Sequence, residues 1–257
     1  MQINRANILG VQVSAINMSL AIEAFENWIK EGEKTYVCVT PAHSVMDCVQ
    51  DHRLYPLFNN SGMTTPDGMS LAWLLKLKGY KNVKRVAGSD LMREVLAYSV
   101  QRGWKHYFYG GAIGTPEKLS QHFKSTYPEI KIVGAYSPPF RNLTRDEELE
   151  ITSQINATQP DIIWVGISSP KQERWMAKHI NELSASVLVG VGAAFDFLSG
   201  QKQRAPLWMQ KTGLEWLFRL ITEPKRLWPR YRLYPLFVFL ALAQILGFWK
   251  LENKKGK

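Results

Sequence analysis

Residues 106–117, HYFYGGAIGTPE, contain the features that decide the fold of this 257-residue chain. The apolar run at 106–109 is typical of a buried strand, and the glycines at 110–114 are typical of a tight turn. Thr115-Pro116-Glu117 then has the residues that begin a helix: an N-cap hydroxyl, a proline at the first position and an acid in the first turn. A strand that turns directly into a helix is the repeating unit of a parallel sheet.

The same alternation extends in both directions along the chain. Apolar runs predict further strands at residues 36–40, 130–135, 162–165 and 187–191. Helical spacing predicts helices at residues 42–51, 69–78, 91–101, 115–127, 144–157 and 171–183. Thr144 and Glu147 fit a capping box, and Ser169-Pro170 resembles the helix start at Thr115. We predict an α/β fold, with a Rossmann-like parallel sheet that has helices on both faces.

The formal net charge of +10 is concentrated in one part of the sequence. Residues 202–257 contain 12 of the 32 Lys and Arg but only 3 of the 22 Asp and Glu, so residues 1–201 carry a net charge of about +1. A uniformly basic nucleic-acid-binding protein is therefore disfavoured, and we expect no nucleic-acid partner. We interpret residues 1–200 as the core and residues 201–257 as a helical, membrane-docking appendage.

The appendage combines prolines, tryptophans and basic residues with an uncharged run at 233–249, LYPLFVFLALAQILGFW. About 17–25 apolar residues are needed to cross a bilayer, and Pro235 and Gln244 interrupt this short run. The basic cluster just before it favours contact with anionic lipid. We expect peripheral or monotopic membrane attachment; a single span is less favoured, and a helix packed on the core is the remaining alternative.

Other sequence features narrow the compartment and the chemistry. Cys38 and Cys48 are too few for a disulfide framework or a four-ligand zinc site, and residues 1–19 lack the pattern of a secretory signal. No HExxH, Cys/His cluster, DxD or GxSxG motif is present. We expect a protein at the cytoplasmic face of the plasma membrane, without a metal or another cofactor.

Polar and small residues follow each expected strand, where parallel sheets place ligands and catalysts. The candidates are Thr40, His43, Asp67, Gly110, Gly111, Tyr136, Gln172 and Asp196. The glycines either bring backbone N–H groups to a phosphate or only form a tight turn. Asp67 in Pro-Asp-Gly is either functional or a plain turn residue.

Three candidates lie in apolar or helical surroundings. Asp196 between Phe195 and Phe197 needs a partner, such as ribose hydroxyls or backbone donors, because an unpaired buried carboxylate is costly. His43 is either a structural histidine or a functional one, and Gln172 either faces a ligand or faces solvent from the first turn of a helix.

The order and spacing of several motifs resemble the bacterial glycosyltransferases of family 26, from about residue 34 to residue 232. The motifs are TPAH (40–43), TTPDGMSLAW (64–73), RVAGSDLM (85–92), YFYGGAIGTPE (107–117), SPPF (137–140), VGISSPKQERW (165–175) and VGVGAAFDFLSGQKQRAP (189–206). The resemblance implies an inverting, metal-independent transfer of a sugar, ManNAc-like or related, from a UDP-sugar. The implied acceptor is a polyprenyl-diphosphate-linked saccharide used in cell-surface polysaccharide synthesis.

The resemblance also implies roles for individual residues. Asp67 is implied as the general base, with Thr40 near the sugar as a second catalytic-site residue. Gln172 is implied at the donor sugar, and Asp196 with Tyr136 at the nucleotide. Arg85, the loop of Gly110 and Gly111, or basic appendage residues are left to stabilise the leaving diphosphate. The appendage arginines are Arg219, Arg226, Arg230 and Arg232.

The donor and some alternatives stay open on the sequence. Family members often have Asn where this chain has Ala42, so either His43 compensates or the donor sugar differs. A membrane-anchored, nucleotide-cofactor oxidoreductase is disfavoured because no GxGxxG with an acid about 20 residues later is present. A catalytically silent nucleotide-binding scaffold is the other alternative. The oligomeric state is open, a homo-oligomer included.

Overall fold

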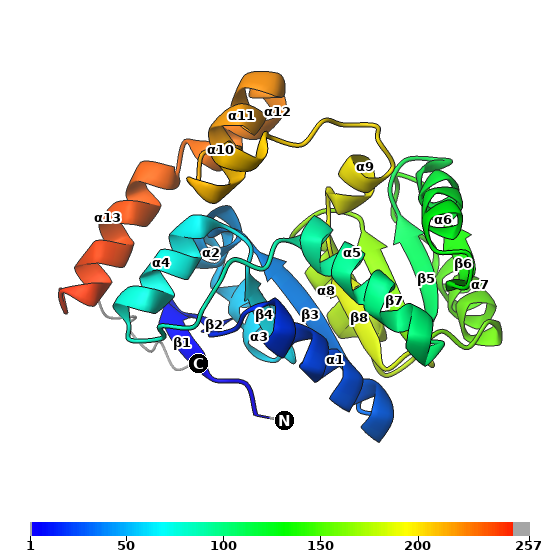
Figure 1. Cartoon of the computed structure of the whole chain (residues 1–257). Helices are drawn as coiled ribbons and strands as arrows, with labels where there is room; N and C mark the ends of the chain where they lie inside the picture. The colour runs from blue at the N-terminus through cyan, green and yellow to red at the C-terminus, as the bar shows by residue number, and fades with distance from the viewer. Residues whose placement is uncertain (1, 249–257) are drawn as a thin grey trace.

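A computed structural model describes residues 2–248, and its centre is a six-stranded parallel sheet (Figure 1). The strands lie in the order β4-β3-β8-β7-β5-β6, and every neighbouring pair is parallel. Their bounds are β3 Thr35–Thr40, β4 Met63–Pro66, β5 Lys105–Gly110, β6 Lys131–Tyr136, β7 Ile162–Gly166 and β8 Val187–Gly190. The predicted α/β fold is confirmed.

Helices cover both faces of this sheet because successive side chains of each strand point to opposite sides. In β3, Tyr36 and Cys38 belong to one buried cluster, and Val37 and Val39 belong to the other. The first cluster includes side chains of α2 (Ala42–Gln50), α3 (Tyr55–Asn59), α4 (Met69–Leu77), α7 (Arg145–Ala157) and α8 (Lys171–His179). The second includes side chains of α1 (Met18–Glu31), α5 (Gly88–Ser99), α6 (Thr115–Thr126) and α9 (Ala194–Leu198). Two 3₁₀ turns, η1 (His52–Leu54) and η2 (Val100–Arg102), adjoin α2 and α5.

Two of the three predicted helix starts differ from the structure. The capping box is confirmed: the Thr144 hydroxyl accepts from the Glu147 N–H, and the Glu147 carboxylate accepts from the Thr144 N–H. The prediction for Thr115 is wrong, because Gly114 caps α6 with a φ of +81° and the Thr115 hydroxyl accepts from Gln201 instead. Ser169 likewise does not cap α8; it precedes Pro170 through a cis peptide bond, and Pro170 is the N-cap.

The N-terminal segment adds elements that the sequence analysis did not assign. Strands β1 (Arg5–Ile8) and β2 (Val11–Ser14) form an antiparallel hairpin that lies beside β4. The Ser14 hydroxyl accepts a hydrogen bond of 3.0 Å from the Thr64 N–H, which ties the hairpin to the sheet edge. Helix α1 follows, with Asn17 as its N-cap.

Four helices after residue 206 form the appendage, near α2 and α4 (Figure 1). They are α10 (Leu207–Lys211), α11 (Glu215–Thr222), α12 (Pro224–Tyr231) and α13 (Tyr234–Ile245). Phe237 and Ala241 of α13 pack in the core, and Gln244 bonds to the β1–β2 hairpin at Leu9 and Asn7. The predicted division of the chain after residue 200 stays a prediction, and residues 249–257 of the predicted appendage lie outside the described residues.

The uncharged run at 233–249 is helical only over α13, and Trp249 lies outside the described residues. Within residues 2–248, no helix has the length and the apolar character that crossing a bilayer requires. The outer side of α13 is nevertheless strongly apolar: Phe239 is 68% exposed and Leu236, Val238 and Leu242 are exposed as well. Part of the uncharged run therefore packs on the core, and part of it faces outward.

Candidate active site

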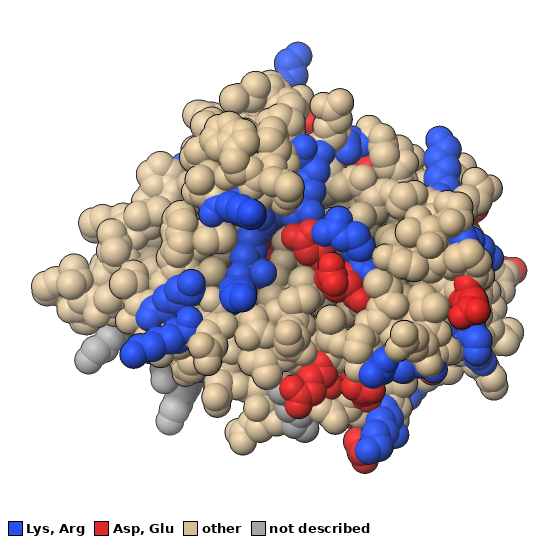
Figure 2. All heavy atoms as spheres, viewed as in Figure 1, with Lys and Arg blue, Asp and Glu red and all other residues tan. Residues whose placement is uncertain are grey.

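A cavity of about 360 Å³ lies between the carboxyl ends of the strands and the appendage. The core side is formed mainly by residues that follow β3, β4, β7 and β8, and the appendage side by residues of α10, α11, α12 and α13. Ligands of open parallel sheets bind at this edge, where the strand order reverses. Figure 2 shows basic side chains gathered around a hollow on this face, with acidic side chains next to them.

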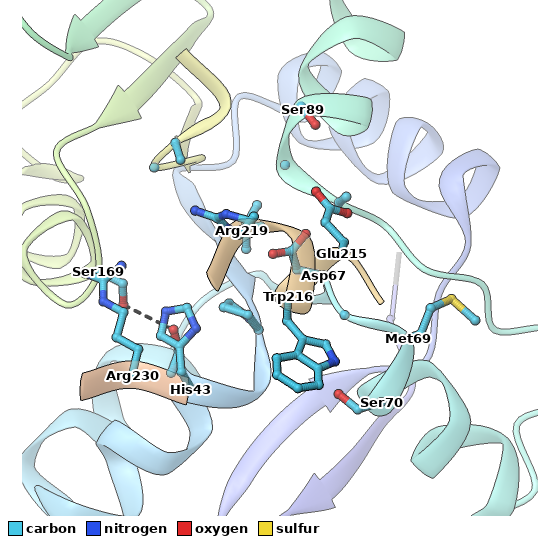
Figure 3. A pocket seen from close by; sticks show the side chains of 18 of the residues that line it. His43, Asp67, Met69, Ser70, Ser89, Ser169, Glu215, Trp216, Arg219 and Arg230 are labelled. Atoms are coloured by element: carbon cyan, nitrogen blue, oxygen red, sulfur yellow. Dashed lines mark hydrogen bonds between the residues drawn. The ribbon is translucent and has the colours of Figure 1, made fainter. Parts of the chain in front are cut away.

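Asp67 lies on the core side of the cavity, directly after β4 (Figure 3). Its backbone N–H donates to the carbonyl oxygen of Thr40, the last residue of β3, at 3.2 Å. Burial raises the pKa of the Asp67 carboxyl, the charge of Glu215 acts in the same direction, and Arg85, Arg219 and Arg204 oppose them. A raised pKa makes this carboxylate a stronger base than an ordinary aspartate.

Arg85 connects Asp67 to the appendage. Its Nε donates to the backbone carbonyl oxygen of Asp67 at 2.6 Å, and its Nη2 forms an ion pair with Glu215 of α11. Its guanidinium is thus held against the backbone of Asp67 and not against the carboxylate. The carboxylate of Asp67 stays available to the cavity.

Three of the four predicted appendage arginines line the cavity: Arg219, Arg226 and Arg230. The Arg219 guanidinium lies 5.4 Å from the ring centre of Phe197, and Arg226 is held by two hydrogen bonds of 2.6 Å to Glu223. Burial is the main cause that lowers the pKa of Arg230. Guanidinium groups on one side of a cavity bind phosphate and diphosphate groups well. The fourth predicted arginine, Arg232, is exposed and does not line the cavity.

His43 and Gln172 also line the cavity. Burial, with a smaller contribution from Arg230 and Arg219, lowers the pKa of His43 to about 3, so the imidazole is neutral near pH 7. Its Nδ1 has no hydrogen-bond partner within the described part of the chain.

The amide of Gln172 is engaged at both ends. Its Oε1 accepts from the Gly192 N–H at 3.0 Å, and its Nε2 donates to Glu173 at 3.0 Å. Gln172 therefore connects the start of α8 to the loop after β8. The carboxyl of its neighbour Glu173 is buried, and this burial raises its pKa to about 7.

Several predicted site residues lie outside the cavity lining. Thr40 is fully buried and its hydroxyl donates to the Cys38 carbonyl oxygen at 3.0 Å, although its neighbours Val39 and Pro41 line the cavity. Tyr136 stacks on Tyr109, with ring centres 6.1 Å apart. The ligand-binding roles of these residues stay predictions.

Asp196 also lies outside the lining, and its partner differs from the predicted kinds. Lys202 Nζ lies 3.0 Å from the Asp196 carboxylate, and the same Nζ lies 3.0 Å from Glu223. Asp196 therefore takes part in a charged link between α9 and the appendage.

The glycines after β5 are explained by close packing. A Cβ at Gly110, where φ is +120°, would come within 2.7 Å of the Gly166 backbone. A Cβ at Gly111 would contact Thr115 and Phe195. These contacts favour the tight-turn interpretation, and the predicted contact of these glycines with phosphate is untested.

Sequence reasoning missed Glu215, Trp216, Tyr231 and Tyr234, which line the cavity from the appendage, and Arg204, which pairs with Asp90 at 2.5 and 2.8 Å. The basic and aromatic composition of the appendage indicated that the segment is functional, but it did not indicate which of its side chains line the cavity. Within residues 2–248, no group of three or more His, Cys, Asp or Glu side chains is arranged to hold a metal ion.

A Rossmann-like sheet whose carboxyl edge borders a cavity with buried carboxylates and several arginines is typical of an α/β enzyme. The chain belongs to the Glycosyl transferase WecG/TagA/CpsF family, whose sequence model matches residues 6–251, and it is a glycosyltransferase. This agrees with the family resemblance inferred from the sequence.

Curated relatives with similar sequences carry one name, N-acetylglucosaminyldiphosphoundecaprenol N-acetyl-beta-D-mannosaminyltransferase. The protein of Bacillus subtilis (strain 168) is 29% identical over 76% of this chain and 74% of its own length. The protein of Bacillus spizizenii (strain ATCC 23059 / NRRL B-14472 / W23) is 28% identical over 84% of this chain and 81% of its own length. The protein of Staphylococcus aureus (strain NCTC 8325 / PS 47) is 25% identical over 91% of each chain.

Proposed function

We propose that this chain transfers N-acetylmannosamine or a related sugar from a UDP-sugar to a polyprenyl-diphosphate-linked saccharide. The names of the relatives support the sugar and the acceptor class, since they describe transfer of an N-acetylmannosaminyl group to N-acetylglucosaminyl-diphosphoundecaprenol. The observation that carries the proposal is the position of Asp67 across one cavity from Arg219, Arg226 and Arg230.

In this reaction, the Asp67 carboxylate removes the proton of the acceptor hydroxyl as its oxygen attacks the anomeric carbon. The new C–O bond forms on the face opposite the bond to UDP, so the anomeric centre is inverted. The electron pair of the breaking bond goes to the diphosphate of UDP. The appendage arginines stabilise that charge, so no general acid is required.

A lipid-linked acceptor requires the enzyme to meet the membrane, and we propose that α13 provides this contact at the cytoplasmic face. Phe239, Leu242 and Leu246 are exposed at 68%, 48% and 68%, and contiguous exposed apolar groups are typical of interaction sites. Arg230 and Arg232 precede the helix, where cations attract anionic lipid. The attachment is peripheral or monotopic.

The test is UDP release from a panel of UDP-sugars, measured with and without a polyprenyl-diphosphate-linked N-acetylglucosamine. We expect acceptor-dependent release from one donor. Asp67→Asn lowers kcat by roughly 10²–10⁴-fold, because the amide cannot take the proton, while UDP affinity by calorimetry changes less than about threefold.

Asp146→Asn is the matched control, because Asp146 is an exposed aspartate in the first turn of α7. It is expected to retain full turnover. Full activity of Asp67→Asn would remove Asp67 from the mechanism. Binding of UDP without release from any donor would instead favour the silent scaffold.

A further inference from the structure

Glu215 is an acidic side chain on the appendage side of a cavity whose other appendage charges are arginines. It is the first residue of α11, and its side chain is 17% exposed. Figure 3 shows its carboxylate next to that of Asp67. Two carboxylates placed close together repel each other, so positive charge is needed nearby to compensate.

Two arginines, Arg85 and Arg204, supply this positive charge. Glu215 pairs with Arg85, and its other oxygen lies 3.6 Å from Nε of Arg204. Arg204 in turn holds Asp90 of α5 with bonds of 2.5 and 2.8 Å. The side chains of Arg85 and Arg204 are only 14% and 18% exposed, so these charges are largely removed from water.

The consequence for Asp67 comes from the position of Arg85. Arg85 uses Nε on the backbone carbonyl of Asp67, Nη2 on Glu215 and Nη1 on the Gln210 carbonyl at 3.4 Å. With Glu215 absent, Nη2 loses its anionic partner, and the charge of Arg85 also acts on the carboxylates of Asp67 and Asp90. Asp90 is already paired with Arg204, so Asp67 is the carboxylate left for Arg85 to approach. An arginine paired directly with the base would lower its pKa and weaken it.

We propose that Glu215 is a positioning residue that couples the seating of the appendage to the base strength of Asp67. It keeps Arg85 on the backbone of Asp67 and away from its carboxylate, and it does so only while α11 is seated on the core. This inference rests on the proposed role of Asp67 as the general base. If Glu215 has this role, the core without the seated appendage is a weak catalyst even when the whole sheet is correctly folded.

The chain offers a matched control in Glu223. This carboxylate takes part in the charged link between the appendage and α9, because Lys202 contacts both Glu223 and Asp196, and its side chain is 24% exposed. Its partners are Lys202 at 3.0 Å and Arg226 at 2.6 Å, and it does not line the cavity. Glu223→Gln therefore removes a similar charge without changing the partners of Arg85.

The test compares the pH dependence of kcat for the full-length chain and its variants, with UDP release as the readout. In Glu215→Gln we expect kcat to fall about tenfold or more and the acid limb of the profile to move to lower pH, because Arg85 is released toward the Asp67 carboxylate and Asp67 also loses a neighbouring negative charge. Glu215→Asp keeps the charge, so its acid limb stays within about 0.3 pH of the parent. Glu223→Gln leaves the acid limb in place as well. An unmoved limb in a folded Glu215→Gln, with kcat within twofold of the parent, would overturn the inference.

A second measurement separates this inference from the proposed function and does not need turnover. Hydrogen exchange of the full chain reports the seating of α11 directly. We expect Glu215→Gln to speed exchange in residues 215–222 and in the segment around Asp67, while the amides of β7 and β8 stay protected. If the parent releases no UDP, the proposed function fails and exchange alone decides on the seating. Unchanged exchange in both segments would then refute the role of Glu215.

Discussion

The core and the appendage are held by different forces. Strands β3, β4, β5, β7 and β8 bury their apolar side chains, and Trp164, Phe108 and Phe195 have no exposed surface. Helices α10 and α11, in contrast, contain no fully buried residue. Their position depends on charged contacts such as Arg85–Glu215 and Lys202–Glu223, and on the packing of α13.

The cavity therefore has one half that apolar packing holds in place and one half that charged contacts hold in place. Apolar packing fixes the core to within small distances and contains no charge for salt to screen or for pH to titrate, apart from buried groups such as Glu173. Charged contacts depend on both. The two halves should therefore respond differently to mutation and to solution conditions.

The largest difference is expected between two tryptophans. Trp164 lies in β7, stacks on Phe25 with ring centres 6.3 Å apart, and donates to His106 at 3.2 Å. Trp164→Ala should lower the free energy of unfolding by about 3–5 kcal/mol. Trp208 of α10 is 60% exposed, so Trp208→Ala should change it by less than about 0.5 kcal/mol. Urea unfolding measures both, and equal effects would contradict the comparison.

A smaller effect is expected from Glu173, a carboxyl of the core whose side chain is fully buried. Burial raises its pKa from 4.5 to about 7, so the folded chain holds a proton that the unfolded chain loses. The stabilisation is complete below pH 4.5 and is lost as the pH rises to about 7, by about 3 kcal/mol.

Glu173→Gln removes this pH dependence, because its neutral amide has nothing to ionise. The variant should be more stable than the parent at pH 8, which thermal unfolding at pH 5 and pH 8 measures. Asp146→Asn controls for the loss of any carboxylate, since Asp146 is exposed. A parent whose stability is flat between these pH values would argue against a neutral Glu173.

The smallest effect on the folded protein is expected on the outer side of α13. Phe239→Glu with Leu246→Glu should leave the unfolding free energy within about 0.5 kcal/mol, because both side chains are 68% exposed. Binding to vesicles that contain anionic lipid should nevertheless weaken by about 30-fold or more. Sedimentation measures this binding. Substituting Leu149 of α7, which is 58% exposed, with Glu is the control.

The same contrast explains how much could be predicted from the sequence. The strands and helices that were predicted in the core lie within a few residues of their predicted bounds, because burial on both faces of a sheet leaves a clear apolar pattern. The β1–β2 hairpin, α1, α3 and α9 were not predicted. The position of Asp67 at the cavity follows from its place after β4. The helix starts at Thr115 and Ser169 were mispredicted, because Gly114 and Pro170, which have no capping side chain, occupy the N-cap positions.

The appendage could be predicted only in outline. Its charge, prolines and tryptophans marked it as distinct from the core, but which cation meets which carboxylate depends on how helices dock. Asp196 illustrates this: its apolar neighbours indicated that it needs a partner, and the partner is Lys202. Arg85 with Glu215 is a pair separated by 130 residues, and no local pattern relates the two.

The two-part cavity also has a consequence for how the protein is made. All six strands of the central sheet have been translated by residue 190, whereas the helices with Glu215, Arg219, Arg226 and Arg230 follow only after residue 206. Domains fold as they emerge from the ribosome, beginning from the N-terminal side. A nascent core can therefore take its shape while the half of the cavity that bears these arginines does not yet exist. The complete cavity can therefore form only after the appendage has been translated as well.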